Sequence, residues 1–169
     1  MRLRKETTMD IIYNICFITR KRSNEVEVLM LFRQKDPNRH KWNGIGGKIE
    51  KGETIDESME REILEETGLK VRGMSFRGIV TWNETGGMYV YRAEEAGGGL
   101  SACDEGELAW KPFHWVMEAS DVVSNIKYYL NDILQDEPPQ EFACTYENEQ
   151  LISVKKKPLP DMAKELIFN

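Results

Sequence analysis

Residues 47–69 read GKIEKGETIDESMEREILEETGL, and this stretch predicts a short helix that carries many carboxylates. Thr54, followed three residues later by Glu57, forms a capping box that favours the start of a helix. Gly68 supplies the left-handed residue at which helices commonly end. We therefore expect a helix that begins at Thr54 and stops before Gly68.

Three carboxylates share one face of this expected helix. Glu62, Glu65 and Glu66 are spaced i, i+3 and i+4, so their side chains fall within one arc. An aliphatic stripe that runs from Ile55 to Ile63 overlaps the edge of this arc and turns it toward the body of the protein. Crowded carboxylates repel one another, and burial disfavours their charged forms further. A divalent cation would resolve this conflict, and oxygen ligands favour Mg²⁺, or alternatively Mn²⁺, over zinc.

The alternative is a solvated surface, which is the common role of a glutamate-rich helix. The neighbouring residues favour the metal site. Gly44, Gly46 and Gly47 precede the helix, and glycine lets a backbone carbonyl or amide approach a ligand closely. Arg61 stands beside Glu62, where we expect its charge to orient that carboxylate and to lower its pKa.

Residues 47–69 also match, position for position, the pattern G-x5-E-x7-R-E-U-x-E-E-x-G-U, where U is a bulky aliphatic residue. On this pattern the chain resembles the Nudix hydrolases. The resemblance implies an α/β fold, an α/β/α sandwich around a mixed β-sheet, and Mg²⁺-assisted hydrolysis of a nucleoside diphosphate linked to another moiety. The nine specified positions are Gly47, Glu53, Arg61, Glu62, Ile63, Glu65, Glu66, Gly68 and Leu69.

The resemblance assigns roles to these residues by position. Arg61 would hold the catalytic carboxylates, and Glu53 would brace the loop before the helix. Glu62 and Glu66 are candidates for the general base, and closely spaced carboxylates titrate as a group. The implied metal ligands are the backbone carbonyl of Gly46 and the carboxylates of Glu62, Glu65 and Glu66.

A second resemblance lies just before this pattern. Residues 42–48 read WNGIGGK, which is similar to the same segment in the MutT-like branch of 8-oxo-dGTP diphosphatases. In the animal enzymes of that branch, the residue at the position of Asn43 reads the edge of the base. Arg33, on the preceding strand, falls where the branch places a basic residue at the substrate site. Lys48 completes this group of candidate substrate-binding residues.

Two further segments bear on this second resemblance. Asp104-Glu105 resembles a distal acidic pair of the branch, which makes Glu105 a candidate metal ligand or base. The animal branch also carries a Trp and two adjacent Asp residues that clamp the oxidised purine, but here residues 122–125 read VVSN. Asn125 could offer a bidentate amide to a purine, or it could cap a helix that begins near Ile126. Both alternatives stay open at this point.

The composition predicts one soluble domain over residues 1–169, since 40% of the residues are hydrophobic and 31% are charged. A net charge of −6 argues against a stable nucleic-acid partner. No stretch is apolar over the length that a bilayer requires, so no membrane partner is expected. A homodimer stays open, and either Met1 or Met9 could be the native start.

The three cysteines are far apart in sequence and form no Cys-x-x-Cys pair, so a disulfide framework is not expected. This pattern favours a reducing compartment, and we expect a cytoplasmic protein. Isoprenyl diphosphate isomerase chemistry, which also occurs on the Nudix fold, would need a catalytic Cys near residues 47–69, and none lies there. The cysteines are Cys16, Cys103 and Cys144.

Hydrophobic patterning predicts the remaining elements, whose order fits a layered α/β sheet. A C-terminal hairpin over residues 141–155, turned at 147–149, could extend that sheet. On a strand over residues 108–116, Trp110 and Trp115 would lie on opposite faces, so at most one would face a pocket. The expected strands are 11–19, 26–33, 74–82, 88–93 and 108–116, and the second expected helix is 126–134.

These resemblances imply a purine nucleoside triphosphate such as 8-oxo-dGTP as the substrate and partner, with Mg²⁺ as the cofactor. The products would be the nucleoside monophosphate and pyrophosphate. Within the family the alternative substrates are ADP-ribose, dinucleoside polyphosphates and capped RNA. A module that senses a nucleotide without cleaving it is the alternative from another class, although a pure binding module has no need of every carboxylate.

Overall fold

The computed structural model describes residues 9–167, so the alternative start at Met1 lies outside the described residues. Its strands form one nine-stranded sheet in the order β3-β2-β1-β6-β5-β8-β9, with β4 paired to β1 and β7 paired to β2. The strands are β1 (Tyr13–Arg22), β2 (Glu25–Arg33), β3 (Trp42–Asn43), β4 (Ile45–Lys48), β5 (Lys70–Trp82), β6 (Gly86–Gly97), β7 (Gly106–Pro112), β8 (Gln140–Glu147) and β9 (Gln150–Pro158).

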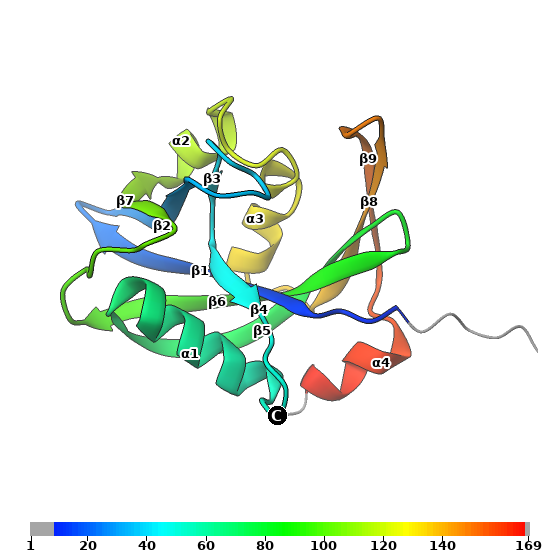
Figure 1. Cartoon of the computed structure of the whole chain (residues 1–169), viewed down its shortest axis with the longest axis horizontal. Helices are drawn as coiled ribbons and strands as arrows, with labels where there is room; N and C mark the ends of the chain where they lie inside the picture. Colours follow the sequence, from blue (N-terminus) through cyan, green and yellow to red (C-terminus); the bar gives the residue numbers. More distant parts are fainter. Residues whose placement is uncertain (1–8, 168–169) are drawn as a thin grey trace, which may run out of the picture.

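Helices cover both faces of this sheet (Figure 1). On one face α1 packs its apolar stripe against the sheet, and the C-terminal helix α4 joins the same buried cluster. On the other face α3 is the main cover, beside the short helix α2. The helices are α1 (Ile55–Thr67), α2 (Phe113–Glu118), α3 (Ile126–Leu134) and α4 (Asp161–Lys164), followed by the 3-10 turn η1 (Glu165–Ile167).

The sequence of β1 shows why two cores form. Successive side chains of a strand point to opposite faces, and every residue from Ile15 to Ile18 is buried. Ile15 and Phe17 belong to the cluster under α3, whereas Cys16 and Ile18 belong to the cluster under α1. A strand that is apolar on both faces therefore needs helices on both sides.

The sheet is mixed, as the resemblance implied. β1 pairs with β6 in parallel, and β5 pairs with β8 in parallel, whereas the other ladders are antiparallel. The expected α/β sandwich is therefore confirmed. The predicted C-terminal hairpin is present as β8 and β9, and it extends the sheet beyond β5.

The expected strand over residues 108–116 is wrong in its second half. β7 ends at Pro112, whose backbone lacks an N–H donor, and the chain turns directly into α2. Trp115 therefore lies on a helix, and its ring packs edge-on against Trp42 at a centroid distance of 5.7 Å. Trp110 stays on β7, where the Arg20 guanidinium stacks over its ring at 4.3 Å. The prediction that Trp110 and Trp115 lie on opposite faces of one strand is therefore wrong.

Two other segments differ from the predicted elements. The glycine-rich residues before α1, which were not among the predicted strands, contain the short strands β3 and β4, which pair with β2 and β1. α4 and η1 follow the terminal hairpin and were not expected. No helix in residues 9–167 combines the length and the apolar character that crossing a membrane requires.

Candidate active site

The carboxylate helix α1 begins and ends where the sequence predicts. The Glu57 backbone N–H donates to Thr54 Oγ1 at 3.1 Å, which is one half of the capping box. At the other end Gly68 is left-handed, with φ of 70°, and its N–H donates to the Leu64 carbonyl. These two caps fix where along the chain the carboxylates of α1 stand.

Arg61 connects the loop before α1 to the helix itself. Its Nε and Nη2 atoms donate to the two carboxylate oxygens of Glu53 at 2.7 and 2.9 Å. Nη1 of the same guanidinium donates to Glu62 at 3.1 Å and to Glu65 at 3.2 Å. The hydrogen bonds from Arg61 hold the pKa of Glu53 below its ordinary value. Bidentate pairing of this kind fixes the orientation of both groups.

Glu66 is a buried carboxylate of α1 with a strongly raised pKa. The residue is 7% exposed, and its Oε2 atom has no hydrogen-bond partner among residues 9–167. Burial, followed by the charges of Glu105 and Glu62, raises the pKa of Glu66 to about 9. A buried polar atom without a partner is rare in proteins, which makes this oxygen a candidate ligand atom.

We expected Arg61 to lower the pKa of Glu62, but that pKa is raised. Desolvation by burial has the larger effect, and it outweighs both the charge and the hydrogen bond of Arg61. The charge of Arg61 favours the ionised carboxylate, but the burial of the Glu62 side chain disfavours it more strongly. Glu65 differs from both neighbours, because its side chain is 62% exposed.

Glu105 reaches this cluster from another part of the chain. It stands just before β7, and its carboxylate accepts a 3.4 Å contact from Arg33 Nη1. Its charge is also one of the causes of the raised pKa of Glu66. The fold therefore brings the distal acid predicted from the sequence to the face of α1 that carries Glu66.

The strand β4 brings glycine backbone next to the same carboxylates. A Cβ atom at Gly47 would lie 2.6 Å from Glu62 Oε1, and one at Gly46 would lie 2.0 Å from the Asn14 carbonyl oxygen. Side chains at these positions would separate β4 from β1 or push Glu62 away. The glycines are thus explained by close approach of the backbone to its neighbours.

Glu62, Glu65, Glu66 and Glu105 form the carboxylate cluster of the site. Their oxygen atoms are chemically suited to a hard divalent cation. Within residues 9–167, no three acidic, histidine or cysteine side chains are placed closely enough to enclose an ion. Arg61 instead engages Glu62 and Glu65 in the structure. Glu66 Oε2 remains without a partner, and all the nearby candidate donors are oxygens, which are the ligands that Mg²⁺ and Mn²⁺ prefer.

A cavity of about 430 Å³ opens beside β4. Its volume is suited to a ligand of the size of a nucleotide. Five of the predicted site residues contribute to its wall: Arg33, Asn43, Gly46, Glu105 and Asn125. Sequence reasoning did not assign four of the other lining residues to the site: Tyr13, Asn14, Trp82 and Met88. An asparagine within the apolar run of β1 was the available signal for Asn14.

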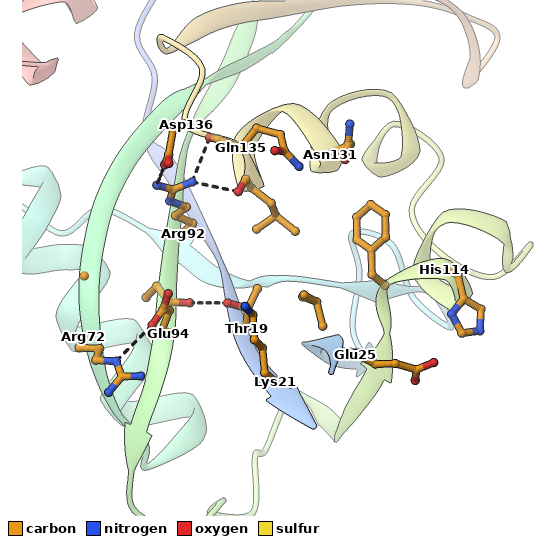
Figure 2. Close-up of a pocket in the computed structure, with 15 residues that line it drawn as sticks. Thr19, Lys21, Glu25, Arg72, Arg92, Glu94, His114, Asn131, Gln135 and Asp136 are labelled. Atoms are coloured by element: carbon orange, nitrogen blue, oxygen red, sulfur yellow. Dashed lines mark hydrogen bonds and ion pairs between the residues drawn. The ribbon is translucent and has the colours of Figure 1, made fainter. Parts of the chain in front are cut away.

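A larger cleft of about 780 Å³ lies elsewhere, between the sheet and α3, and Figure 2 shows its lining. Its arginines are already engaged. Arg92 donates to Asp136 and to the carbonyls at the end of α3, while Arg72 pairs with Glu94. No member of the α1 carboxylate cluster lines this cleft. Size alone therefore does not make it the better candidate.

A family model described as the NUDIX domain matches residues 13–132, which run from β1 into α3. The chain belongs to the NUDIX domain family. This confirms the resemblance that residues 47–69 indicated. The Nudix match ends before the C-terminal hairpin β8–β9, so that hairpin lies outside the matched residues.

Several relatives of this Nudix chain act on oxidised purine nucleotides by name. An oxidized purine nucleoside triphosphate hydrolase of Danio rerio is 33% identical over 88 residues, covering 49% of this chain and 56% of the relative. An 8-oxo-dGDP phosphatase of Danio rerio, NUDT18, is 26% identical over 144 residues, covering 78% of this chain and 44% of the relative. The chain thus spans about half the length of these curated relatives.

Solved structures of other Nudix proteins share the fold. A mutator MutT protein from Bacillus halodurans superimposes with a TM-score of 0.69 and 26% identity, covering 88% of this chain and 98% of that chain. A Nudix hydrolase from Nitrosomonas europaea gives a TM-score of 0.61 at 19% identity, covering 81% of each chain. The second likeness bears on the fold alone.

Asn43 and Asn125, the two asparagines at the cavity that the sequence predicted as substrate-binding residues, are held by different partners. Asn43 Oδ1 accepts a hydrogen bond from the Gly44 backbone N–H at 2.9 Å. Asn125 directly precedes α3, but its side chain makes no capping hydrogen bond to that helix. Its Nδ2 atom donates instead to Tyr146 Oη at 3.2 Å. The capping alternative for the Asn125 side chain is therefore wrong.

Proposed function

We propose that this chain is a Mg²⁺-dependent Nudix hydrolase of purine nucleoside triphosphates such as 8-oxo-dGTP, which it converts to the monophosphate and pyrophosphate. Glu66 carries the most weight in this proposal. Its Oε2 atom is buried without a partner among the described residues, and burial, followed by the charges of Glu105 and Glu62, raises the pKa of Glu66 to about 9. A group in that state lacks the positive charge that a divalent cation would supply.

The proposed metal ligands are the Gly46 carbonyl and the carboxylates named above, Glu62, Glu65, Glu66 and Glu105. A divalent ion bound there would neutralise charge on the diphosphate and make an attacking water more acidic. Glu62 would have to exchange its contact with Arg61 for this role, or share it. Mn²⁺, with the same preference for oxygen, is the alternative cofactor.

The chain's own residues divide the remaining work. Water attacks a phosphorus of the linkage between the α- and β-phosphates, a new P–O bond forms, and the bond from that phosphorus to the bridging oxygen breaks, which separates the monophosphate from pyrophosphate. The water proton passes to a carboxylate of the cluster, for which Glu62, Glu66 and Glu105 are the candidates. Arg61 keeps Glu53 and the glycine loop braced against α1 while this happens.

Base recognition would fall to residues that line the cavity. Asn43 and Asn125 line the cavity with amide groups, and Arg33 brings a positive charge to the same wall. Lys48, at the end of β4, remains a proposed substrate-binding residue, although it is not among the lining residues of the cavity. The names of the relatives in Danio rerio support an oxidised purine.

A substrate panel tests this proposal at fixed Mg²⁺, with the products separated by ion-exchange chromatography. The panel contains 8-oxo-dGTP, dGTP, dCTP, ADP-ribose, diadenosine tetraphosphate and capped RNA. We expect the highest kcat/KM for a purine triphosphate, with pyrophosphate as a product. Preference for dCTP or ADP-ribose would overturn the purine assignment. Binding without turnover of any member would favour the sensing module instead.

A matched pair of variants on α1 tests the carboxylate assignment. Glu66→Gln should abolish Mg²⁺-dependent turnover while the circular dichroism spectrum and the thermal transition remain those of a folded protein. Glu60→Gln is the control, because Glu60 is exposed on the same helix and lies outside the cluster. An unchanged rate in Glu66→Gln would remove the site assignment.

A further inference from the structure

The side-chain amide of Asn125 has a hydrogen-bond partner for its NH₂ group but none for its carbonyl oxygen among the described residues. The residue is 5% exposed and lines the cavity beside β4. Its Nδ2 atom donates to Tyr146 Oη at 3.2 Å, whereas its Oδ1 atom is buried and has no partner among residues 9–167. A structural asparagine in a core normally has both ends of its amide hydrogen-bonded. The carbonyl oxygen is therefore an acceptor that no described protein group uses, on a residue that lines the cavity.

The backbone of Tyr146 is hydrogen-bonded to the turn between β5 and β6. Its N–H donates to Asn83 Oδ1 at 2.7 Å, at the tip of the turn between β5 and β6. The Asn83 N–H in turn donates to the Cys144 carbonyl at 2.9 Å. These bonds tie the C-terminal hairpin to the strands at the cavity. The hairpin thus presents the Tyr146 hydroxyl to Asn125 from a fixed backbone.

Nearby ionisable groups agree with this arrangement. Burial raises the pKa of Cys144 to about 11, and a hydrogen bond from the Asn125 side chain opposes the rise. Burial also raises the pKa of Tyr146, against hydrogen bonds from Ser124 and Asn125. The phenol and the thiol stay neutral at physiological pH. The Asn125 NH₂ group is therefore directed at neutral acceptors on β8, away from a role as donor to a ligand.

Asn43 shows the complementary arrangement on the same cavity. Its Oδ1 atom is occupied by the Gly44 N–H, which leaves the Nδ2 group as the end available to a ligand. Asn43 would then offer a donor and Asn125 an acceptor. Such a pair of amides, each fixed by a different neighbour, demands one acceptor and one N–H donor from the molecule that it binds.

We propose that Tyr146 is a positioning residue that fixes the Asn125 amide, so that the site selects nucleobases bringing an N–H donor to Asn125 Oδ1. This inference rests on the proposed function, because it assumes that the cavity takes the base of a nucleotide. Tyr146 lies outside residues 13–132, the part of the chain that the family model matches. The C-terminal hairpin thereby becomes part of base selection.

Equilibrium binding without metal tests this proposal independently of turnover. Calorimetric titrations in EDTA would use dGMP, 8-oxo-dGMP and purine deoxyriboside 5′-monophosphate, whose base has acceptors and no N–H donor. We expect the wild type to bind dGMP or 8-oxo-dGMP about 10-fold or more tightly than the donor-free nucleotide, because the latter leaves a buried acceptor unpaired.

Tyr146→Phe removes the hydroxyl and keeps the ring. It should reduce the ratio of the two affinities severalfold, because the Asn125 amide can then turn its NH₂ group toward the ligand. Asn125→Leu should reduce the ratio as well. Tyr128→Phe is the control, since Tyr128 is exposed on α3 and does not line the cavity, and it should leave the ratio unchanged.

Two results would overturn the role of Tyr146. One is an unchanged affinity ratio in Tyr146→Phe, and the other is an equal loss of affinity for all three nucleotides, which a general structural effect would produce. Neither result affects the substrate panel, which depends on metal and turnover. Conversely, failure of every nucleotide to be hydrolysed while the base preference persists would refute the hydrolase function and leave the Tyr146 assignment standing.

Discussion

The Asn14 side chain joins the first strand to the carboxylate helix through a buried hydrogen bond to Ser58. Asn14 Nδ2 donates to Ser58 Oγ at 2.9 Å, and both residues are buried. The Asn14 Oδ1 atom accepts the Gly47 N–H at 3.3 Å. A hydrogen bond from Ser58 also helps to lower the pKa of Glu53. One asparagine therefore links β1, the glycine strand and α1, the three elements that meet at the carboxylate cluster.

Ser58→Ala should destabilise the protein, because it leaves the Asn14 NH₂ group buried without an acceptor. The cost of such a group is about 1 to 3 kcal/mol. Urea denaturation followed by circular dichroism measures the change in unfolding free energy. Ser120→Ala is the control, because Ser120 is exposed, and it should stay within about 0.5 kcal/mol of the wild type. Equal stability of the two variants would mean that the Asn14 link contributes little.

Gly47→Ala should disturb the carboxylate cluster directly. The added methyl would stand 2.6 Å from Glu62 Oε1, so Glu62 must move or β4 must shift. We expect Mg²⁺-dependent turnover to fall by about 10-fold or more, because small displacements of catalytic groups are costly. Steady-state kinetics with 8-oxo-dGTP as the substrate measures this loss.

Gly99→Ala is the matched control for that variant. A Cβ atom at Gly99 meets no neighbour within 4 Å, and the residue precedes the distal acid in the chain. Its turnover should remain close to that of the wild type. If Gly47→Ala kept full activity, the close approach of β4 to Glu62 would have no role in the reaction.

The metal-free protein should lose stability as the pH rises, because of Glu66. In the folded state its pKa is raised to about 9 from an ordinary value of 4.5, so the protonated carboxyl favours the folded state. That contribution is complete below about pH 4.5 and is lost as the pH rises toward 9. Thermal unfolding in EDTA between pH 5 and 8.5 measures the slope.

Glu66→Gln should flatten this dependence, because glutamine stays neutral throughout the range. At pH 8.5 the free energy of unfolding of the variant should exceed that of the metal-free wild type by roughly 1 to 3 kcal/mol. This is less than the full pKa shift of Glu66 implies, because neighbouring carboxylates share protons. Glu60→Gln should keep the wild-type slope. Parallel curves for wild type and Glu66→Gln would show that Glu66 ionises freely in the folded state.

The sequence predicts best those features that depend on local spacing. The bounds of α1 follow from Thr54 and Gly68, and its buried stripe follows from helical periodicity. The cores on the two faces follow from the apolar run of β1. The sheet partners and the arrival of Glu105 beside Glu66 depend on long-range contacts, so only the family pattern anticipated the latter.

Features that depend on one residue's environment were predicted less well. An apolar run with two tryptophans suggested a strand through residue 116, and Pro112 ended it earlier. The pKa of Glu62 depends on its depth, which no spacing in the sequence specifies. The partner of Asn125 comes from β8, and the contact spans 21 residues of chain. These properties depend on burial and on residues distant in the chain, which local sequence patterns do not specify.

Trp82 should contribute to binding of the base rather than to the chemical step. Its indole lines the cavity at the end of β5, and a Cβ atom at Gly86 would lie 2.6 Å from its Nε1 atom, so the paired glycine leaves room for the ring. Trp82→Ala should raise KM by about 5- to 100-fold, with little change in kcat, because base stacking on an aromatic face contributes about 1 to 3 kcal/mol.

Steady-state kinetics with 8-oxo-dGTP separates this effect on KM from an effect on kcat. Trp110→Phe is the control, because Trp110 stacks with Arg20 and does not line the cavity, so its KM should match the wild type. Trp82→Phe should lose less than Trp82→Ala, since it keeps an aromatic face. If Trp82→Ala lowered kcat and left KM unchanged, the ring would have no part in holding the base, and the cavity wall at Met88 and Asn125 would have to supply that affinity.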